Sequence, residues 1–303
     1  MQSWRVSTKK QYNTYLEKWG VFCEGKKKDP LKRDSCLVLE FLTQLYDKQY
    51  SFSALNTARS ALSTLFYSPA IGEHVLIKRF MRSVFNARPN LPRYSQIWDV
   101  SLVLKYLEKL SPGKCLSLLQ LSKKLATLIA LVTGQRTQTI KSLTLNDLEY
   151  TNNAAIFHVK TLLKHDSIYN NKQNRLFTLV AYPNNVKLCV VTYLKQYINR
   201  TKSLRNGNQL FVSTQAPHHA VSSSTISRWI KTSLQEAGID TSVYSAHSTR
   251  AASTTAAAKT LDVSVILQAA NWTNERTFGR YYQRPVEQEK ASTAFGLAVL
   301  QRK

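Results

Sequence analysis

Three short stretches of the sequence carry side chains that could act together on a phosphate. Arg136 follows a long apolar run, so it lies where the chain turns out of a protein core. His247 and Arg250 open an alanine-rich segment, and their spacing would place both on one face of a helix near its N-terminus, a natural phosphate site. Trp272 comes nine residues before Tyr281. Fixed cations, hydrogen-bond donors and a nucleophilic side chain are what direct attack on phosphorus requires.

Other routes to phosphate chemistry lack their usual residues in this sequence. Enzymes that use two metal ions hold them with clustered carboxylates, but residues 98–303 contain 11 acidic residues, and those near the three stretches stand singly. No glycine-rich loop of the type that binds nucleoside triphosphates is present, and the chain has only 9 glycines. We therefore expect a reaction that needs no metal ion, no ATP and no other cofactor.

Each candidate residue also has a purely structural interpretation. Arg136 could be a cation that stabilises the carbonyl end of a helix. A single histidine such as His247 more often has a structural role than a catalytic one, and Tyr281 is one of 15 tyrosines. The order and the spacing of the residues, taken together, favour a shared site.

The composition of the 303-residue chain indicates a polyanionic partner. The chain has 42 Lys and Arg against 18 Asp and Glu, a formal net charge of +24. Hydrophobic residues make up 43%, enough for one or two folded cores and too much for a disordered basic tail. No apolar run reaches the roughly 20 residues of a membrane span and no secretory signal is visible, so we expect no membrane partner. The four scattered cysteines favour a reducing, intracellular compartment.

Residues 1–97 predict a small all-helical domain. Apolar residues recur at helical spacing in four stretches, near positions 7–22, 37–45, 54–66 and 76–85, with Ser7 as a possible cap of the first helix. The predicted apolar face of the fourth helix consists of Leu76, Phe80, Met81, Val84 and Phe85. Proline, asparagine and arginine without helical spacing make residues 86–97 the predicted linker.

Basic residues on the exposed faces of this domain and in its linker are candidate contacts to the polyanion, although any single one could be a solvated surface charge. They are Lys26, Lys27, Lys28, Arg59, Lys78, Arg79, Arg82, Arg88 and Arg93. The net charge is +9 over residues 1–97 and +15 over residues 98–303. This distribution suits two domains that bind the same polyanion from two sides.

Residues 98–303 predict a second domain in which helices surround a small β-sheet. The apolar run 118–132 indicates a helix that ends at Gly134. Lys123 and Lys124 interrupt the run, so we expect this helix to be buried in the protein and not to span a membrane. Residues 155–159 and 176–180 are rich in β-forming residues and are joined by a polar stretch, which is typical of a hairpin with a long loop. Helices follow near 190–198 and 223–237, the second stopped by Gly238. The predicted fold class is mainly α with a small β-sheet.

The order of these features resembles that of the tyrosine recombinases over almost the full length of the chain. The shared features are an arginine, a lysine-bearing hairpin, a His-x-x-Arg pair, and an indole nine residues before a tyrosine. The run 134–139, Gly-Gln-Arg-Thr-Gln-Thr, is similar to the recombinases of eukaryotic DIRS-type retrotransposons and related mobile elements. The resemblance implies an all-α core-binding domain and a mixed α/β catalytic domain that close around double-stranded DNA as a C-shaped clamp. It also implies a nuclear location in a eukaryotic host.

The resemblance implies a role for each candidate residue. Tyr281 attacks the scissile phosphate and becomes joined to DNA through a 3′-phosphotyrosyl bond, which conserves the bond energy without ATP. Arg136 and Arg250 hold the non-bridging oxygens as bidentate donors, a task for which lysine is a poor substitute. His247 accepts or donates a proton near the nucleophile, and Trp272 contacts the phosphate.

Two of the implied assignments have rivals in the sequence. Lys160, at the end of the first hairpin strand, would protonate the departing 5′ oxygen as general acid, with Lys164 as the alternative. Tyr282 competes with Tyr281 as nucleophile, but the nine-residue spacing from Trp272 favours Tyr281.

The sequence departs from the family pattern at two positions. Thr139 stands where many members have an acidic residue three positions after the first arginine, so the support of that carboxylate would come from elsewhere. Trp272 stands where many have a second histidine, although its indole N–H can still donate a hydrogen bond.

The C-terminal tail, residues 283–303, carries an apolar set that could pack on its own domain. In the family such a segment often docks on a neighbouring subunit, which implies a homotetramer on two DNA sites that exchanges strands through a Holliday junction. Two other functions stay open. A type IB topoisomerase uses a similar set of side chains and would relax plasmid DNA without strand exchange, and a protein of the same fold could bind DNA without cleaving it.

Overall fold

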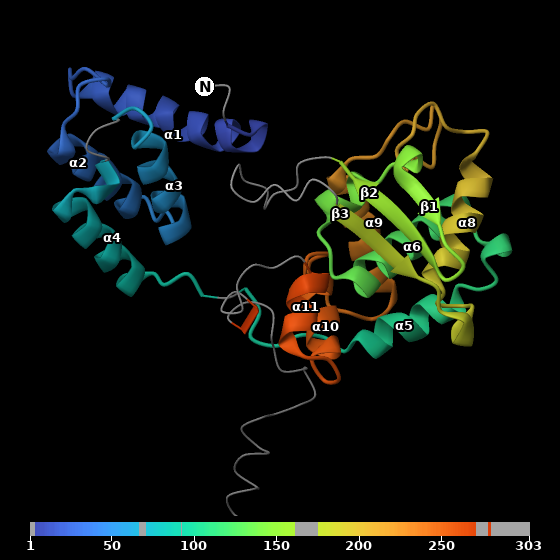
Figure 1. Ribbon diagram of the computed structural model, residues 1–303. Helices are drawn as coiled ribbons and strands as arrows, with labels where there is room; N and C mark the ends of the chain where they lie inside the picture. Colours follow the sequence, from blue (N-terminus) through green and yellow to red (C-terminus); the bar gives the residue numbers. More distant parts are fainter. Residues whose placement is uncertain (1–3, 67–70, 92, 161–174, 271–277, 280–303) are drawn as a thin grey trace, which may run out of the picture. The chain divides into compact units, whose positions relative to one another are not determined.

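A computed structural model describes residues 4–66, 71–91, 93–160, 175–270 and 278–279 of the chain (Figure 1). The backbone separates into two compact units, Met1–Leu91 and Pro92–Lys303. Each unit has its own hydrophobic core. None of the helices within the described ranges combines the length and the apolar character that crossing a bilayer requires.

The first unit is built from helices whose starts are set by short polar side chains. The carboxylate of Asp34 accepts two backbone N–H groups of the first turn of α2, and the Ser51 hydroxyl accepts one from α3. By contrast α1 begins after Arg5 without a side-chain cap, so Ser7 does not cap it as predicted, because Ser7 already lies within the first helical turn. The helices are α1 (Val6–Gly25), α2 (Ser35–Asp47), α3 (Phe52–Leu62) and α4 (Val75–Ala87), with a short 3-10 turn η1 (Ile71–Glu73) before α4.

The core of the first unit is centred on Trp19 of α1. Its ring lies against the rings of Phe22, Phe41 and Phe66, with centroid distances of 5.8, 5.4 and 6.4 Å. Its indole N–H donates to the carbonyl of Pro30 at 2.9 Å. These contacts join α1 to α2 and to the segment that follows α3, and they bury the apolar positions that predicted the helices.

Helix α4 packs the middle of its predicted apolar face on this core, where Phe80, Met81 and Val84 lie, but not the two edges of that face. Leu76 and Phe85, assigned to its apolar face, are exposed, whereas the buried side chains are Ile77, Met81 and Val84. The buried positions are spaced by four and three residues, which matches one side of a helix. The helix also extends through Ala87, so the first two residues of the predicted linker are helical.

The second unit contains the remaining helices and the sheet (Figure 1). Its helix α6 ends at Gly134, whose φ of 58° is the left-handed conformation predicted for a helix stop, and α9 is stopped by Gly238 with φ 87°. The helices are α5 (Val100–Lys109), α6 (Leu118–Thr133), α7 (Thr137–Lys141), α8 (Val190–Thr201), α9 (Ser223–Glu236), α10 (Ser248–Ala257) and α11 (Val263–Ala269), and the 3-10 turns are η2 (Gly113–Cys115), η3 (Leu145–Asp147) and η4 (Pro183–Asn185).

Helix α6 is buried from Leu121 to Leu131, and two lysines are buried with it. Lys123 forms an ion pair with Glu236 at 2.6 Å. Lys124 is fully buried, and its ammonium donates to the carbonyl of Leu110 at 2.7 Å and lies 3.8 Å from the centre of the Tyr193 ring. Burial lowers the pKa of Lys124 to about 7. The predicted buried helix is confirmed, and its lysines are satisfied inside the unit rather than at the surface.

The sheet has three antiparallel strands in the order β1 (Leu148–Tyr150), β2 (Ala154–Val159) and β3 (Arg175–Val180). Strands β2 and β3 form the predicted hairpin, with Phe157 opposite Phe177. Strand β1, which the sequence analysis did not predict, pairs with β2 so that Leu148 lies opposite Phe157. A three-residue strand with only one partly buried side chain leaves no alternating pattern in the sequence.

The chain enters the second unit before α5. Ile97 and Trp98, on either side of the predicted domain boundary, are both buried in the core of the second unit. The indole N–H of Trp98 donates to the Ser248 hydroxyl at 2.8 Å, at the start of α10. The segment that enters the unit therefore anchors the helix that carries Arg250.

Candidate functional site

The turn after α6 carries Arg136. Gly134 adopts a left-handed conformation, Gln135 is buried, and Arg136 follows in an extended conformation as the residue before α7. Arg136 is half-buried. The helices on either side, α6 and α7, fix the backbone position of Arg136.

Helix α10 carries the predicted pair His247 and Arg250. His247 is exposed and stands at the N-cap position, where the positive end of the helix dipole lies. Arg250, one turn further, is 1% exposed. The start of α10 is held by Ser248, whose hydroxyl donates to the carbonyl of Ser245 at 2.7 Å and accepts from Trp98.

The guanidinium of Arg250 joins three parts of the second unit. One terminal nitrogen donates to the carbonyl of Gly134 at 2.6 Å, and the other donates to the carbonyl of Ala270 at 2.7 Å. Gly134 is two residues from Arg136, and Ala270 directly follows α11 and is two residues before Trp272. The structure thus brings Arg250 to the turn of Arg136, while His247 lies one helical turn away.

Gln135 ties the same turn to α11. Its side-chain amide donates to the carbonyl of Ala269 at 3.0 Å, beside the carbonyl that accepts from Arg250. The last carbonyls of a helix lack partners within the helix, so side chains must satisfy them when they are buried. The sequence analysis treated Gln135 as part of a motif and did not assign it this role, since only the spatial neighbour reveals it.

Lys160 lies directly after β2 and forms an ion pair with Asp147. The distance from its ammonium to Asp147 Oδ1 is 2.5 Å, and the side chains of Lys160 and Asp147 are 75% and 17% exposed. The other oxygen, Oδ2, accepts from the Thr144 hydroxyl at 2.5 Å. The hydrogen bond from Lys160, helped by the one from Thr144, lowers the pKa of Asp147 below its usual range.

Sequence reasoning missed Asp147. A signal exists, because Asp147 and Glu149, two residues apart, meet Lys160 and His158 diagonally across the two strands. It can be recognised only once β1 is paired with β2. Across the described ranges, no three His, Cys, Asp or Glu side chains gather in a way that could hold a metal ion.

Four of the predicted site residues lie outside the described residues. They are Lys164, Trp272, Tyr281 and Tyr282. Helix α11 and Phe278 are the described elements nearest to the last three along the sequence. Phe278 is buried with Ile266 and Ala270 in a small cluster that also includes the end of α10.

The basic residues predicted to contact a polyanion from the helical domain and its linker fall into two groups. Most are exposed, namely Lys26, Lys27, Lys28, Lys78, Arg79, Arg82 and Arg93. Arg88 instead donates to the carbonyls of Tyr46 and Tyr50 at 2.9 and 3.1 Å and stacks 3.8 Å from the centre of the Tyr46 ring. Arg59 points at the carbonyl of Gly72. Arg59 and Arg88 are therefore engaged inside the first unit.

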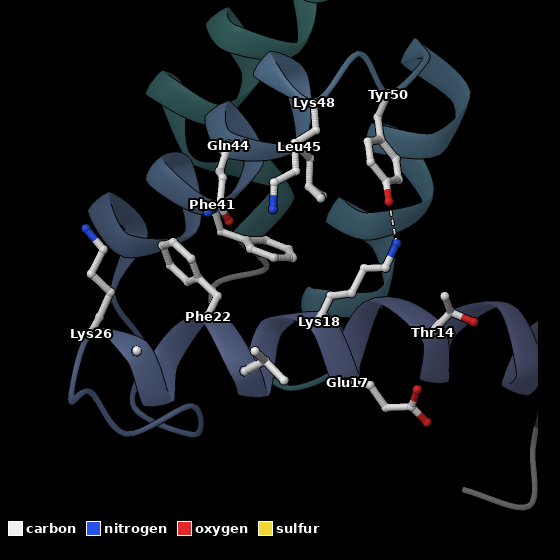
Figure 2. A pocket seen from close by; sticks show the side chains of 12 residues that line it. Thr14, Glu17, Lys18, Phe22, Lys26, Phe41, Gln44, Leu45, Lys48 and Tyr50 are labelled. Atoms are coloured by element: carbon white, nitrogen blue, oxygen red, sulfur yellow. Dashed lines mark hydrogen bonds between the residues drawn. The ribbon is translucent and has the colours of Figure 1, made fainter.

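A hollow of about 610 Å³ lies between α1 and α2 of the first unit (Figure 2). Phe22 and Phe41 meet in its wall, with ring centroids 5.3 Å apart. The ammonium of Lys18 points at the Tyr50 hydroxyl, to which it is hydrogen bonded, and lies 4.7 Å from the centre of the same ring. Lys26, at the other end, forms an ion pair with Glu40. These lysines link α1 to α2 and to the turn before α3.

Comparison with known proteins gives a family and a fold. The sequence model of the phage integrase family matches residues 100–288, a range that includes Arg136, Lys160, His247, Arg250, Trp272 and Tyr281. The search of curated protein sequences found no match.

Three solved structures illustrate the likeness of fold. XerH site-specific recombinase bound to its palindromic difH substrate is 17% identical, with a TM-score of 0.60 over 89% of this chain and 73% of that chain. A lambda integrase tetramer bound to a Holliday junction is 15% identical, with a TM-score of 0.53 over 93% and 79%. The Tn1549 transposon integrase in complex with transposon right end DNA is 14% identical, with a TM-score of 0.54 over 89% and 86%. The mainly helical fold with a small sheet is therefore one that recombinases adopt.

Proposed function

The chain belongs to the phage integrase family, and we propose that it is a site-specific DNA recombinase that cuts and rejoins strands through a covalent tyrosine intermediate. One observation carries the proposal. The buried guanidinium of Arg250 donates to the backbone of the turn that presents Arg136, one helical turn from the exposed His247. Two cations and a histidine brought together on adjoining elements are suited to bind a phosphate and to stabilise its charge.

In the proposed reaction, the hydroxyl oxygen of Tyr281 attacks the scissile phosphorus as its proton passes to His247. The bond from phosphorus to the 5′ oxygen breaks, and that oxygen takes a proton from the ammonium of Lys160. The DNA 3′ end is then a phosphotyrosyl ester, and a 5′ hydroxyl is released. Attack by another 5′ hydroxyl reverses the step and joins the strand to a new partner, without ATP and without a metal ion.

The two arginines would bind the non-bridging oxygens of the same phosphate, and Trp272 would contact it. Arg250 is buried and already donates to two carbonyls, so its contact with the phosphate would use the second N–H of each terminal nitrogen. The two carbonyl bonds fix the plane of the guanidinium before substrate arrives. Arg136 enters the site from a turn that Gln135 and Gly134 hold against neighbouring elements. Preorganised donors stabilise a transition state more strongly than flexible surface cations.

The proposed partner is double-stranded DNA, which both basic units would contact. The net charge of +24 supports a phosphate-based, sequence-independent component of binding. Lambda integrase is a tetramer on a Holliday junction in its solved structure, and XerH is bound to its substrate. By analogy we propose that this chain acts as a homotetramer on two DNA sites, exchanges strands in pairs, and uses its C-terminal segment for subunit contacts.

Within the family, we propose that the chain comes from a eukaryotic mobile element of the DIRS type or a relative. The support is the run Gly134 to Thr139, in which glutamine precedes the arginine and threonine takes the place of a frequent acidic residue. Thr139 is buried in α7.

For DNA contacts we propose the exposed residues Lys26, Lys27, Lys28, Lys78, Arg79 and Arg82 of the first unit and Arg93 at the start of the second. Arg59 and Arg88 are weaker candidates because their guanidinium groups already donate to backbone carbonyls of the same unit. A cation held against the protein reaches a phosphate less easily than one on a solvent-exposed stem.

A suicide substrate tests the proposal directly. A DNA duplex that bears a nick next to the cleavage site, selected for binding from a random pool, traps the covalent product because the short cleaved strand diffuses away. The wild-type protein should form an adduct that survives a denaturing gel, Tyr281→Phe should form none, and Tyr282→Phe should retain it. An adduct that persists in Tyr281→Phe and vanishes in Tyr282→Phe would overturn the choice of nucleophile.

A further inference from the structure

Asp147 occupies a prepared position beside Lys160. Both of its carboxylate oxygens are engaged, one with the Lys160 ammonium and the other with the Thr144 hydroxyl, each at 2.5 Å. Asp147 is 17% exposed, whereas Lys160 is 75% exposed. The carboxylate thus lies on the protein side of the pair, and the lysine is its solvent-exposed member.

The backbone around Asp147 is held on both sides. Before it, residues 143–145 pair with residues 208–210, through hydrogen bonds of 2.7 Å from Leu145 to Asn208 and of 2.8 Å from Leu210 to Leu143. After it, Leu148 begins β1 and pairs with β2, whose last residue Val159 precedes Lys160. The register of the sheet therefore sets the position of the carboxylate relative to the root of the lysine.

An ion pair whose lysine is this exposed contributes little to stability, because water and salt screen it. The same weakness allows the ammonium to leave the carboxylate when a phosphate arrives. A general acid must be in place at the moment when the leaving oxygen takes up its negative charge, and until then the carboxylate holds the ammonium at the end of β2.

We propose that Asp147 is the positioning residue of the general acid Lys160, holding the ammonium at the end of β2 until the scissile phosphate replaces the carboxylate as its partner. The inference rests on the proposed strand-transfer function and deepens it. The lowered pKa of Asp147 fits a carboxylate that stays ionised and bound to its lysine.

A neighbouring pair on the same two strands offers a matched control. Glu149 and His158 lie 3.2 Å apart, with exposed side chains of 63% and 42%. Two further charged residues lie on or beside this sheet: Lys195, whose ammonium is 5.1 Å from the centre of the Tyr150 ring, and Arg175, the register partner of Val159. Glu149→Gln removes one carboxylate two residues from Asp147 and leaves the Lys160 contact in place.

The test compares two suicide substrates that differ at one atom. In the first the scissile phosphate has its normal 5′ oxygen, and in the second a sulfur replaces that oxygen. A thiolate departs without being protonated, so cleavage of the second substrate needs no general acid. We expect Asp147→Asn to slow cleavage of the oxygen substrate about tenfold, a part of the roughly 10²–10⁴-fold effect of a general acid. The sulfur substrate should restore the rate of Asp147→Asn and of Lys160→Ala to that of the wild type.

Further variants separate this role from a structural one. Glu149→Gln should cleave both substrates at the wild-type rate, and Asp147→Glu should recover part of the loss. In a Lys160→Ala background, Asp147→Asn should cause no additional loss, since its effect passes through the lysine. Thermal unfolding of each variant, compared with wild type, identifies any variant that fails to fold.

Several outcomes would overturn the inference. Normal cleavage of the oxygen substrate by Asp147→Asn is one, and a loss in Asp147→Asn that sulfur does not restore is another. Rescue of Lys164→Ala but not of Lys160→Ala would move the general acid to Lys164 and remove the basis of the proposal. Failure of the wild type to form an adduct on either substrate would instead reject the proposed function itself.

Discussion

Arg250 combines a predicted role in phosphate binding with two hydrogen bonds inside the fold. Its terminal nitrogens donate to the carbonyls of Gly134 and Ala270, and the side chain is buried. Lysine can donate from a single point only and cannot reproduce this geometry. We expect Arg250→Lys to abolish adduct formation and also to lower the free energy of unfolding by about 1–3 kcal/mol, since a buried carbonyl loses its donor.

Arg136→Lys is the matched comparison for Arg250→Lys. Arg136 is half-buried and stands in an extended segment between two helices. Its replacement should reduce adduct formation while changing the unfolding free energy less than Arg250→Lys does. Urea unfolding measures the unfolding free energies of the two variants. Wild-type stability of Arg250→Lys would show that the two carbonyl bonds contribute little.

At the scale of single residues, the sequence identified residue types better than their partners. Arg250 and His247 were placed on one helix from their spacing, and α10 confirms that placement. The bonds of Arg250 to Gly134 and Ala270, and that of Lys160 to Asp147, join positions distant in sequence. Such contacts arise from packing and sheet register, which local patterns do not contain.

At the scale of elements, the end of α11 is held by the turn after α6. Gln135 donates to Ala269 and Arg250 to Ala270, so two side chains satisfy adjacent carbonyls at that helix end. This helix directly precedes the segment of Trp272 and Tyr281. We expect Gln135→Ala to lower the rate of adduct formation at saturating DNA while the dissociation constant for DNA stays close to that of the wild type. A weaker affinity with an unchanged rate would contradict this role.

Helix α6 contains a buried lysine whose titration should be visible in stability. Burial lowers the pKa of Lys124 from its ordinary value of 10.5 to about 7, against a smaller raising effect of Glu108. Between these two pH values the unfolded chain therefore binds one more proton than the folded chain. Burying Lys124 lowers the free energy of unfolding by its full amount below pH 7, and this penalty disappears as the pH rises toward 10.5.

The matching variant is Lys124→Met, which has no group to titrate at this position. The free energy of unfolding of the wild type, relative to that of Lys124→Met, should increase between pH 7 and pH 10. Urea unfolding of both proteins across this range measures the difference. Parallel curves for the two proteins would mean that Lys124 titrates normally.

The elements themselves were predictable where one local signal dominated. Gly134 and Gly238 end helices as their positions indicated, and the hairpin of β2 and β3 follows its β-rich segments. The apolar side of α4 was predictable but its edges were not, because packing alone buries Ile77 and leaves Leu76 exposed. The short strand β1 exists only through its pairing with β2.

At the scale of the whole molecule, the net charge of +24 should make DNA binding strongly salt dependent. Arg79 is exposed on α4, whereas Arg88 is engaged with Tyr46 and Tyr50. We expect Arg79→Ala to reduce the slope of log K against log salt by about 1, the contribution of one phosphate contact. Arg88→Ala should leave that slope unchanged and lower the melting temperature. An unchanged slope for Arg79→Ala would remove it from the proposed DNA contacts.

The central claim is that one tyrosine of this chain becomes covalently joined to DNA. The adduct formed on a nicked suicide substrate can be digested with protease and nuclease, and mass spectrometry then identifies the residue that retains a nucleotide. The account predicts a single modified residue, Tyr281, linked to the 3′ phosphate of the cleaved strand. The absence of any adduct on DNA that the protein binds, or a nucleotide on a residue other than Tyr281, would contradict it.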